Sequence, residues 1–480
     1  MDHILAWNGI ALEALRRDFA VVPGIERVSP EQGGPTLTSR ALAIVHLAMY
    51  DAHAGVVNQP DLPRYLNTVA SPAAGASASA AVAAAAYNTL VALYPRQTEV
   101  LRETYLAATA SGPGVTEGVA FGQAVAQALL ADRANDPTVS DAGYAPSQAP
   151  GCHRPDPSDP QQGYHAPYYG ARSKLFAVSA RHELDAPPAL GSDDYQAALH
   201  QVRGKGIAPE LAGQLPSTYA KRTVDQSLVG VYWAYDGVRD MGTPPRLYNQ
   251  IVREVAIARG NTVDDNARLF ALVNAAMADA GILAWDQKYV HNLWRPVLGV
   301  REHDGSMGPL GNDATHDIDN DCDPNWLPLG APRSNAIGPN VTPHFPAYPS
   351  GHATFGAAAF HVTRLFYGVP PKDRKADTVF TGSFVSEECN GVTRDNRGVV
   401  RARHVRAFPK GLWQMIEENG FSRVWLGVHW SFDAFALNDQ GKPDLSHNVG
   451  GVALGLKIAE DIFAAGAGKA PAKSSVGPRA

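Results

Sequence analysis

Three segments of the sequence carry side chains that could together bind an anion and transfer protons. They are KYVHNLWRP with Lys288 and Arg295, FPAYPSGHATFG with Ser350, Gly351 and His352, and SRVWLGVHWSFD with Arg423, His429 and Asp433. Lysine and arginine bind oxyanions through charge-assisted hydrogen bonds, and histidine exchanges protons near neutral pH. The residue types therefore fit a pocket for a tetrahedral, multiply charged oxyanion such as phosphate or vanadate.

Lys288 and Arg295 are separated by two turns of an expected helix. At that spacing they share one helix face, about 10 Å apart along the axis, and their long side chains can converge. A solvated helix face is the alternative for this pair alone. The neighbours Trp285, Leu293 and Trp294 make the helix too apolar for that alternative. A buried cation in turn needs an anion.

Ser350 and Gly351 precede the helical run ATFGAAAFHVTRLF. Ser350 can cap this helix, and the first amides, left accessible by Gly351, can face an oxyanion. His352, in the first turn, would lie beside the bound anion and transfer a proton. A plain helix cap is the alternative.

His429 and Asp433 are four residues apart and are expected on one face of a helix. The carboxylate can accept a hydrogen bond from one ring nitrogen and raise the basicity of the other. This arrangement suits a nucleophile or a metal ligand. A purely structural pair is the alternative.

A second set of the same residue types near the N-terminus hints at a duplicated helical bundle. It consists of Ser39, Arg40, His46 and Asp51, against Ser422, Arg423, His429 and Asp433. His46 and Asp51 are five residues apart and diverge on a helix, so we expect them to be structural.

The composition is that of a globular protein. A chain of 480 residues with 45% hydrophobic residues can bury a large core. The formal net charge of -6 lacks the basic excess that nucleic-acid binding needs. Three scattered cysteines, Cys152, Cys322 and Cys389, provide neither a disulfide framework nor a CxxC metal motif.

Helical periodicity dominates the chain, so we predict an all-α fold. Residues 1–225 are predicted as an N-terminal helical half and residues 226–463 as a C-terminal helical half. Residues 135–170, dense in Pro, Gly and Asp, and residues 303–348 are predicted to be long loops. Residues 464–480 lack apolar periodicity and are predicted to be a flexible tail.

The sequence carries no clear targeting or membrane signal. The N-terminal segment mixes acidic residues with short apolar runs and lacks the order of a signal peptide. The Ala-rich stretch 73–93 is the spanning candidate, but its Gly, Ser and Asn residues favour a helix of a soluble protein. We therefore expect no transmembrane segment, and either a cytoplasmic location or export without a leader.

The loop NDATHDIDNDCD, residues 312–323, has alternating acids that suggest calcium. It lacks the glycine and the closing glutamate of an EF-hand. We predict a solvated loop.

The three anion-binding segments resemble the superfamily that joins vanadium-dependent haloperoxidases to type-2 phosphatidic acid phosphatases and bacterial class A acid phosphatases. Further stretches, YWAYDG, GTPPRLYNQIVR, SEECNGVTRD and LGVHWSFDA, resemble the fungal-type vanadium chloroperoxidases. The resemblance runs from about residue 4 to residue 463. It implies two four-helix bundles packed as one body, with the vanadate site in the C-terminal bundle.

The resemblance also implies a role for each matching residue. His429 would ligate vanadium, His352 would hydrogen-bond the apical oxygen, and Lys288 and His352 would assist the activation of hydrogen peroxide. The residues expected to bind the other vanadate oxygens are Lys288, Arg295, Ser350, Gly351 and Arg423. Asp433 and Asp236 would orient His429 and Arg423, although an ordinary surface acid is the alternative for Asp236.

Trp285 and Phe345 match positions that line the halide pocket in chloroperoxidases. Algal bromoperoxidases place a histidine where this sequence has Phe345, and His344 stands directly before it. The alternative is that Trp285 and Phe345 are plain core residues.

The activity implied by the resemblance is the oxidation of bromide and chloride by hydrogen peroxide to hypohalous acid, which halogenates electron-rich organic acceptors. The expected cofactor is vanadate (orthovanadate, vanadium(V)), and phosphate is expected to compete with it. Two alternatives stay open: an acid phosphatase with His429 as nucleophile, and a non-catalytic phosphate-binding scaffold. The sequence excludes neither a monomer nor a homo-oligomer.

Overall fold

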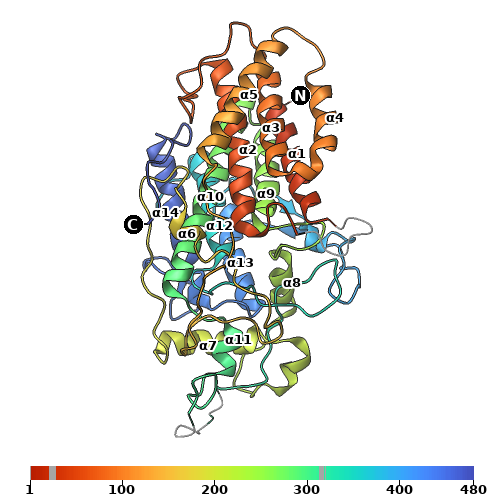
Figure 1. Cartoon of the computed structure of the whole chain (residues 1–480). Coiled ribbons are helices and arrows are strands. Elements are labelled where there is room, and N and C mark those ends of the chain that lie inside the picture. Colours follow the sequence, from red (N-terminus) through yellow and green to blue (C-terminus); the bar gives the residue numbers. More distant parts are fainter. Residues whose placement is uncertain (1, 21–28, 313–317, 319–320, 480) are drawn as a thin grey trace.

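The computed structural model describes residues 2–20, 29–312, 318 and 321–479. The prediction of an all-α fold is confirmed, because the described chain is mostly helical with two very small sheets (Figure 1). The α-helices are α1 (His3–Asp18), α2 (Gly34–Val57), α3 (Ala78–Leu93), α4 (Thr98–Ala108), α5 (Val115–Asp132), α6 (Tyr169–Arg172), α7 (Asp193–Lys205), α8 (Val224–Tyr232), α9 (Pro244–Arg259), α10 (Val263–His291), α11 (Pro296–Arg301), α12 (Gly351–Phe366), α13 (Gly411–Trp425) and α14 (Gly450–Ala465).

Short 3-10 helices and strands complete the described elements. The 3-10 helices are η1 (Pro95–Gln97), η2 (Pro209–Gln214), η4 (Glu387–Cys389) and η5 (Ser431–Asp433). The strands β1 (Ser383–Phe384) and β2 (Arg406–Ala407) pair antiparallel, as do β3 (Ala436–Leu437) and β4 (Pro443–Asp444).

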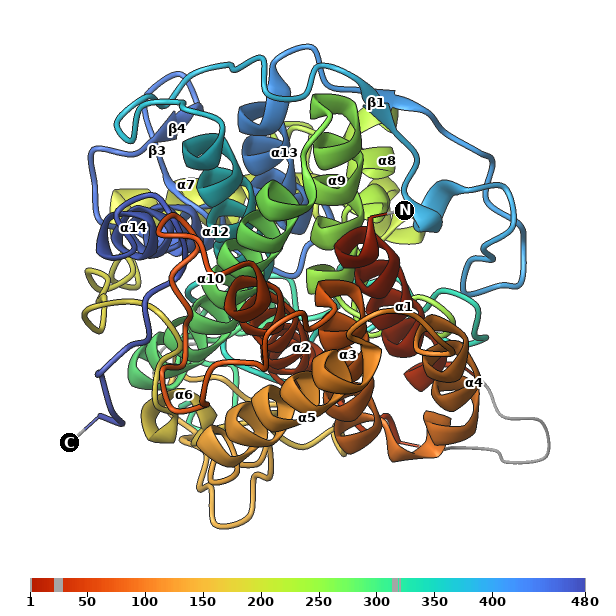
Figure 2. The ribbon, with the colours of Figure 1, turned by 90° about the horizontal axis from the view of Figure 1, so that it is seen from above.

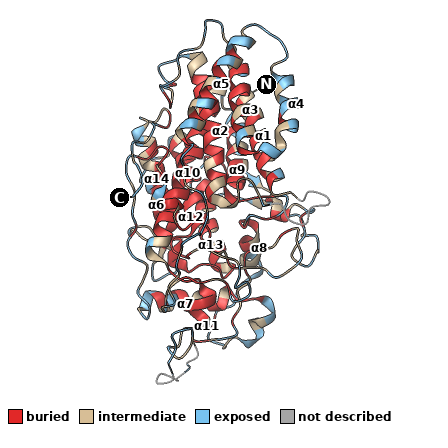
Figure 3. Cartoon of the chain, in the orientation of Figure 1, coloured by how far each residue is buried: buried red, intermediate tan, exposed pale blue. Residues whose placement is uncertain are grey.

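Helix α10 is the central element of the fold. Its N-cap is Thr262, whose side chain accepts from the amide of Asp265, while the Asp265 side chain accepts from the amide of Thr262. On one side it packs on α2, which belongs to the N-terminal group of helices α1, α2, α3 and α5. On the other side it packs on α12 and α14, which form the C-terminal group with α13. In Figure 2 α10 lies between these two groups. The central helices are correspondingly buried along most of their length (Figure 3).

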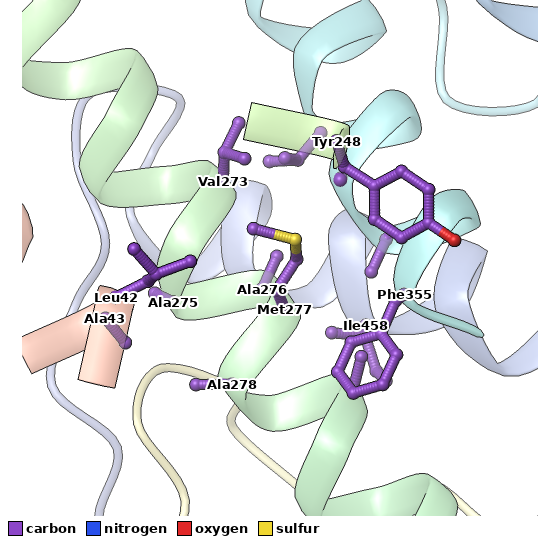
Figure 4. Close-up of a cluster of buried hydrophobic side chains, with 14 of the residues drawn as sticks. Leu42, Ala43, Tyr248, Val273, Ala275, Ala276, Met277, Ala278, Phe355 and Ile458 are labelled. Atoms are coloured by element: carbon purple, nitrogen blue, oxygen red, sulfur yellow. The ribbon is translucent and has the colours of Figure 1, made fainter. Parts of the chain in front are cut away.

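One hydrophobic core runs through both groups of helices. Figure 4 shows Leu42 of α2, Met277 of α10, Phe355 of α12 and Ile458 of α14 in a single cluster, and all four side chains are buried. Within the N-terminal group, α1, α2, α3 and α5 pack together. Within the C-terminal group, α12, α13 and α14 pack together on the other side of α10. The helices that carry the candidate site are thus fixed to a continuous core.

The two segments predicted to be long loops, 135–170 and 303–348, are largely irregular in the described residues. They pack against each other, since the amide of His165 donates to the carbonyl of His344 at 2.8 Å. Cys152 also forms an isolated β-bridge with Leu293, at the end of α10. The loops therefore cover one end of the central helix.

The described residues 464–479 differ from the flexible tail expected there. Helix α14 continues to Ala465, and the following segment returns along residues 171–178. The amide of Ser474 donates to the carbonyl of Phe176 at 2.8 Å, and Arg479 forms an ion pair with buried Asp286 at 2.7 Å. Backbone hydrogen bonds and this ion pair attach residues 466–479 to the fold. Such contacts do not require a periodic pattern of apolar residues, so the sequence does not reveal them.

The Ala-rich stretch 73–93 contains α3, which is shorter than a membrane span. Among the described residues, another helix is long and apolar enough to cross a membrane. That helix is α10, and 94% of its apolar window is buried inside the protein. Such burial is typical of the core helix of a soluble protein.

Asp279 of α10 stabilises the fold by accepting hydrogen bonds from three successive amides. Its carboxylate lies 2.6, 2.8 and 2.9 Å from the amide nitrogens of Phe176, Ala177 and Val178. Replacing Asp279 with alanine leaves three buried donors unpaired, which should lower the free energy of unfolding by about 3 kcal/mol or more. Urea denaturation measures the change, with exposed Asp439→Ala as the control. Equal unfolding free energies for the two variants would contradict this role.

Candidate active site

The three segments singled out in the sequence meet at the ends of α10, α11, α12 and α13. Nη1 of Arg295 lies 2.9 Å from Nε2 of His429, and Nζ of Lys288 donates to the carbonyl of Pro349 at 2.6 Å. The amide of Ser350 donates to the carbonyl of Asp433 at 2.8 Å. Residues distant in the sequence therefore surround one buried location.

The prediction that Lys288 and Arg295 share one helix face is wrong. Helix α10 ends one turn after Lys288, where Asn292 takes a left-handed conformation with φ of 48°, and Arg295 is the N-cap of α11. The two cations nevertheless converge on the ring of Phe345. Nζ of Lys288 lies 5.0 Å from its centroid and Cζ of Arg295 lies 4.9 Å from it.

His429 and Asp433 do form the expected pair, but not on an α-helix. Helix α13 ends at Trp425, His429 lies in the following turn, and Asp433 lies in η5. Nδ1 of His429 donates to the Asp433 carboxylate at 2.7 Å, and the amide of Trp430 donates to the same oxygen at 3.0 Å. Because Nδ1 carries the proton, Nε2 keeps its lone pair.

Ser350 is the N-cap of α12, as predicted, and its hydroxyl accepts from the amide of Ala353 at 3.4 Å. A Cβ atom on Gly351 would lie 3.3 Å from the Trp285 ring, so a side chain there would be tightly confined. His352 occupies the first turn of α12, and its Nε2 donates to the carbonyl of Ala234 at 2.5 Å. The lone pair of this imidazole is therefore on Nδ1.

Asp236 holds Arg423 through two hydrogen bonds. Nη1 and Nη2 of Arg423 lie 3.1 and 2.7 Å from the two carboxylate oxygens. One of these oxygens is also 3.7 Å from Nε2 of His352. The Asp236 side chain, 8% exposed, is thus a partner of Arg423 rather than a surface acid, and it fixes the guanidinium fork.

The site concentrates positive charge away from water. Lys288 and Arg423 have no exposed surface, and Arg295 is 1% exposed. Burial lowers the pKa of Lys288 well below its usual range and that of Arg295 to about 9. Burial also raises the pKa of Asp433 to about 7, although Lys288 and Arg295 favour its charged form. Among the described residues, no carboxylate forms an ion pair with Lys288 or Arg295.

Two guanidinium nitrogens in this cluster are buried without a partner in the part of the chain that the structure describes, namely Nη2 of Arg295 and Nε of Arg423. Unpaired buried donors are costly. An oxyanion would satisfy both and neutralise the uncompensated charge, so the residues fit vanadate or phosphate. The described residues contain no group of three His, Cys, Asp or Glu side chains that could hold a metal cation.

The same contacts show what a bound anion must replace. The three donors of Lys288 Nζ hold the carbonyls of Pro346, Ala347 and Pro349 at 2.8, 3.1 and 2.6 Å. Nη1 of Arg295 faces the lone pair of His429 Nε2. A ligand on His429 would take the place of this last hydrogen bond.

The Trp285 and Phe345 rings lie together beside these cations, with centroids 4.8 Å apart. His165 and His344 flank the pair, and the His165 ring is 5.9 Å from Trp285, 6.1 Å from Phe345 and 5.5 Å from His344. The sequence did not predict His165 at the site, nor His153, whose amide donates to the carbonyl of Asn292 and whose ring feels the charges of Arg295 and Lys288. Both come from the irregular segment 135–170, where no periodicity indicates a neighbour.

His46 and Asp51 are structural, as expected. Both ring nitrogens of His46 are bonded, one to Asn8 at 3.0 Å and one to the carbonyl of Leu42 at 2.7 Å. Asp51 accepts from the amides of Tyr65 and Leu66. The loop 312–323, predicted to be solvated, lies largely outside the described residues.

Comparisons with known proteins agree with the helical fold. The vanadium chloroperoxidase N-terminal domain matches residues 1–163, and the VCPO second helical-bundle domain matches residues 268–453. The vanadium chloroperoxidase of Curvularia inaequalis is 33% identical, over 96% of this chain and 89% of that protein. The chain therefore belongs to the vanadium chloroperoxidase family.

Two solved structures share the fold at lower identity. A bacterial vanadium-dependent iodoperoxidase is 18% identical with a TM-score of 0.60, over 98% of this chain and 97% of that one. The holo form of a bacterial vanadium-dependent chloroperoxidase is 15% identical with a TM-score of 0.61, over 96% of this chain and 97% of that one.

Proposed function

We propose that this protein is a vanadate-dependent haloperoxidase that oxidises bromide and chloride with hydrogen peroxide. Hypohalous acid is the product, and it halogenates electron-rich organic molecules. The observation that carries the proposal is the cluster of buried cations without carboxylate partners, Lys288 and Arg295, beside the lone pair of His429. Family membership supports the same reading.

The residues that would hold vanadate are those of the cationic cluster. His429 would bind the vanadium through Nε2, and Asp433 would keep that nitrogen basic. The groups available for the oxygens are Lys288, Arg295, Arg423, the Ser350 hydroxyl and the Gly351 amide. When bound, vanadate would act as a Lewis acid toward hydrogen peroxide.

The other residues would manage protons and charge. Burial, and then the charge of Arg423, lower the pKa of His352 to about 3, so its imidazole is neutral at ordinary pH. Nδ1 of His352 carries the lone pair, and an oxyanion bound beside Arg423 would offset the positive charge that lowers this pKa, so that Nδ1 would accept a proton from hydrogen peroxide. Asp236 holds the Arg423 fork in place, and Lys288, whose charged form a bound oxyanion would favour, would supply a positive charge to the developing anion.

Bromide oxidation with and without vanadate tests this function. The protein, freed of vanadium, is given hydrogen peroxide, bromide and a brominatable dye, and bromination should appear only after vanadate is added. An acid phosphatase would instead hydrolyse an aryl phosphate and leave the dye unchanged, and a phosphate-binding scaffold would do neither. Bromination that ignores vanadate would contradict the proposal.

Phe345 is expected to set the halide preference. Replacing it with histidine puts a polar, titratable ring beside Lys288 and Arg295, where the native ring packs on Trp285. The rate of chloride oxidation should fall more than that of bromide, by about tenfold in their ratio, because chloride is the harder ion to oxidise. Phe345→Leu, which keeps the wall apolar, is the control. A chloride-to-bromide ratio unchanged across pH would show that Phe345 only packs.

A further inference from the structure

His153 is held against the connection that carries Arg295. Its amide donates to the carbonyl of Asn292 at 2.9 Å, and the preceding Cys152 forms a β-bridge with Leu293. These contacts join the irregular segment 135–168 to the turn between α10 and α11. The main chain of His153 is therefore fixed a few residues from the Arg295 N-cap.

The His153 imidazole is fully buried, and neither ring nitrogen has a hydrogen-bond partner in the described chain. Its ring meets Tyr164 edge-on, with centroids 5.7 Å apart, and that contact uses no nitrogen. The other buried histidines near the site differ, because His165, His352 and His429 each have a bonded nitrogen. A buried imidazole with an unmet donor and an unmet acceptor is costly, so a guest molecule is expected at this ring.

The surroundings of His153 favour a negatively charged guest. Burial, and then the charges of Arg295, Lys288, His344 and Arg154, hold the pKa of His153 well below its usual range. The ring is therefore neutral, keeps one N–H donor, and lies in a positive potential. Arg154 is paired with Glu302, but Lys288 and Arg295 have no such partner among the described residues.

The guest is best matched by a small, weakly hydrated anion. Buried donors without a partner among the described residues include Nη2 of Arg295 and Nε of Arg154, the residue after His153, whereas Nη1 of Arg295 faces His429. The Phe345 ring, 4.9 Å from Cζ of Arg295, adds an apolar surface. A halide is spherical and can accept from two N–H groups while it rests on a ring.

We propose that His153 is a halide-binding residue, whose neutral imidazole and Nη2 of Arg295 hold the bromide or chloride ion before it is oxidised. The inference rests on the proposed haloperoxidase function and adds a substrate-binding residue to it. It makes the irregular segment 135–168 part of the site, not only a cover for it.

Replacing His153 with phenylalanine tests the assignment. This variant should raise KM for bromide by about tenfold and leave KM for hydrogen peroxide within about twofold, because the loss of one hydrogen bond changes affinity by about that factor. His153→Gln, which keeps an N–H donor, should recover most of the affinity. Tyr164→Leu is the matched control, because it disturbs the packing around His153 but keeps the imidazole.

A second measurement does not depend on turnover. Line broadening of the chloride NMR signal reports chloride binding to the vanadium-free protein. The excess broadening should be present in the wild type and in Tyr164→Leu, and lost in His153→Phe. If thermal unfolding shows that His153→Phe does not fold, His153→Leu serves in its place.

The outcomes separate the two proposals. Equal KM for bromide and equal broadening in the wild type and the His153 variants would overturn the halide role and leave an ordered water as the guest. Wild-type protein without vanadate-dependent bromide oxidation would overturn the proposed function instead, while the chloride signal would still decide whether His153 binds a halide.

Discussion

Replacing His429 with alanine should abolish vanadate-dependent halide oxidation. Nε2 of His429 keeps its lone pair and faces the cationic cluster, 2.9 Å from Nη1 of Arg295, and the other ring nitrogen is fixed by Asp433 at 2.7 Å. Loss of an outer partner of a metal ligand costs about 10- to 100-fold in affinity or activity, so loss of the ligand itself should exceed about 100-fold. Halide oxidation at saturating vanadate measures the effect.

The control for this variant is His447→Ala. The His447 side chain is 63% exposed and pairs only loosely with Asp444, at 3.5 Å, so its removal should leave the activity unchanged. Retention of most activity by His429→Ala would show that another group binds the vanadium.

Replacing His352 with alanine should separate vanadate binding from catalysis. The cations Lys288, Arg295 and Arg423 remain, so affinity for vanadate should change by less than about tenfold. Turnover per bound vanadium should fall by about 100-fold or more, because a general base typically contributes 10²- to 10⁴-fold. Vanadium content by elemental analysis and the rate of bromide oxidation give the two quantities.

The opposite pattern would contradict this role. If His352→Ala lost vanadate affinity but kept normal turnover per bound vanadium, His352 would be a binding residue. Because Nε2 donates to the Ala234 carbonyl in the structure, His352→Asn is a useful companion that can restore a donor there but cannot act as a base.

The sequence predicts which residues meet more reliably than how they meet. The spacing of Lys288 and Arg295 equals two helical turns and predicts one helix, but the left-handed Asn292 ends α10 between them. The four-residue spacing of His429 and Asp433 also predicts an α-helix, but a turn and the 3-10 helix η5 bring this pair together instead. In both cases the side chains converge although the backbone follows a different path.

Other features leave no signal in local spacing. His153 and His165 lie in a segment rich in proline and glycine, and only the long-range pairing with residues near Asn292 and His344 brings them to the site. Residues 464–479 were expected to be free because they lack apolar periodicity, yet backbone hydrogen bonds and Arg479 attach them to the fold. Contacts of this kind depend on tertiary structure alone.

The most direct test of the account is a titration of the vanadium-free protein with vanadate, followed by two assays at once. Phosphate is tetrahedral like vanadate, so the same cations should bind it, and the free His429 should give weak hydrolysis of an activated aryl phosphate. We predict that bromide oxidation rises and aryl phosphate hydrolysis falls with the same dependence on vanadate, and that added phosphate shifts both curves to higher vanadate. Phosphatase activity that survives full vanadate loading, or vanadate binding that is indifferent to phosphate, would contradict a single shared oxyanion site.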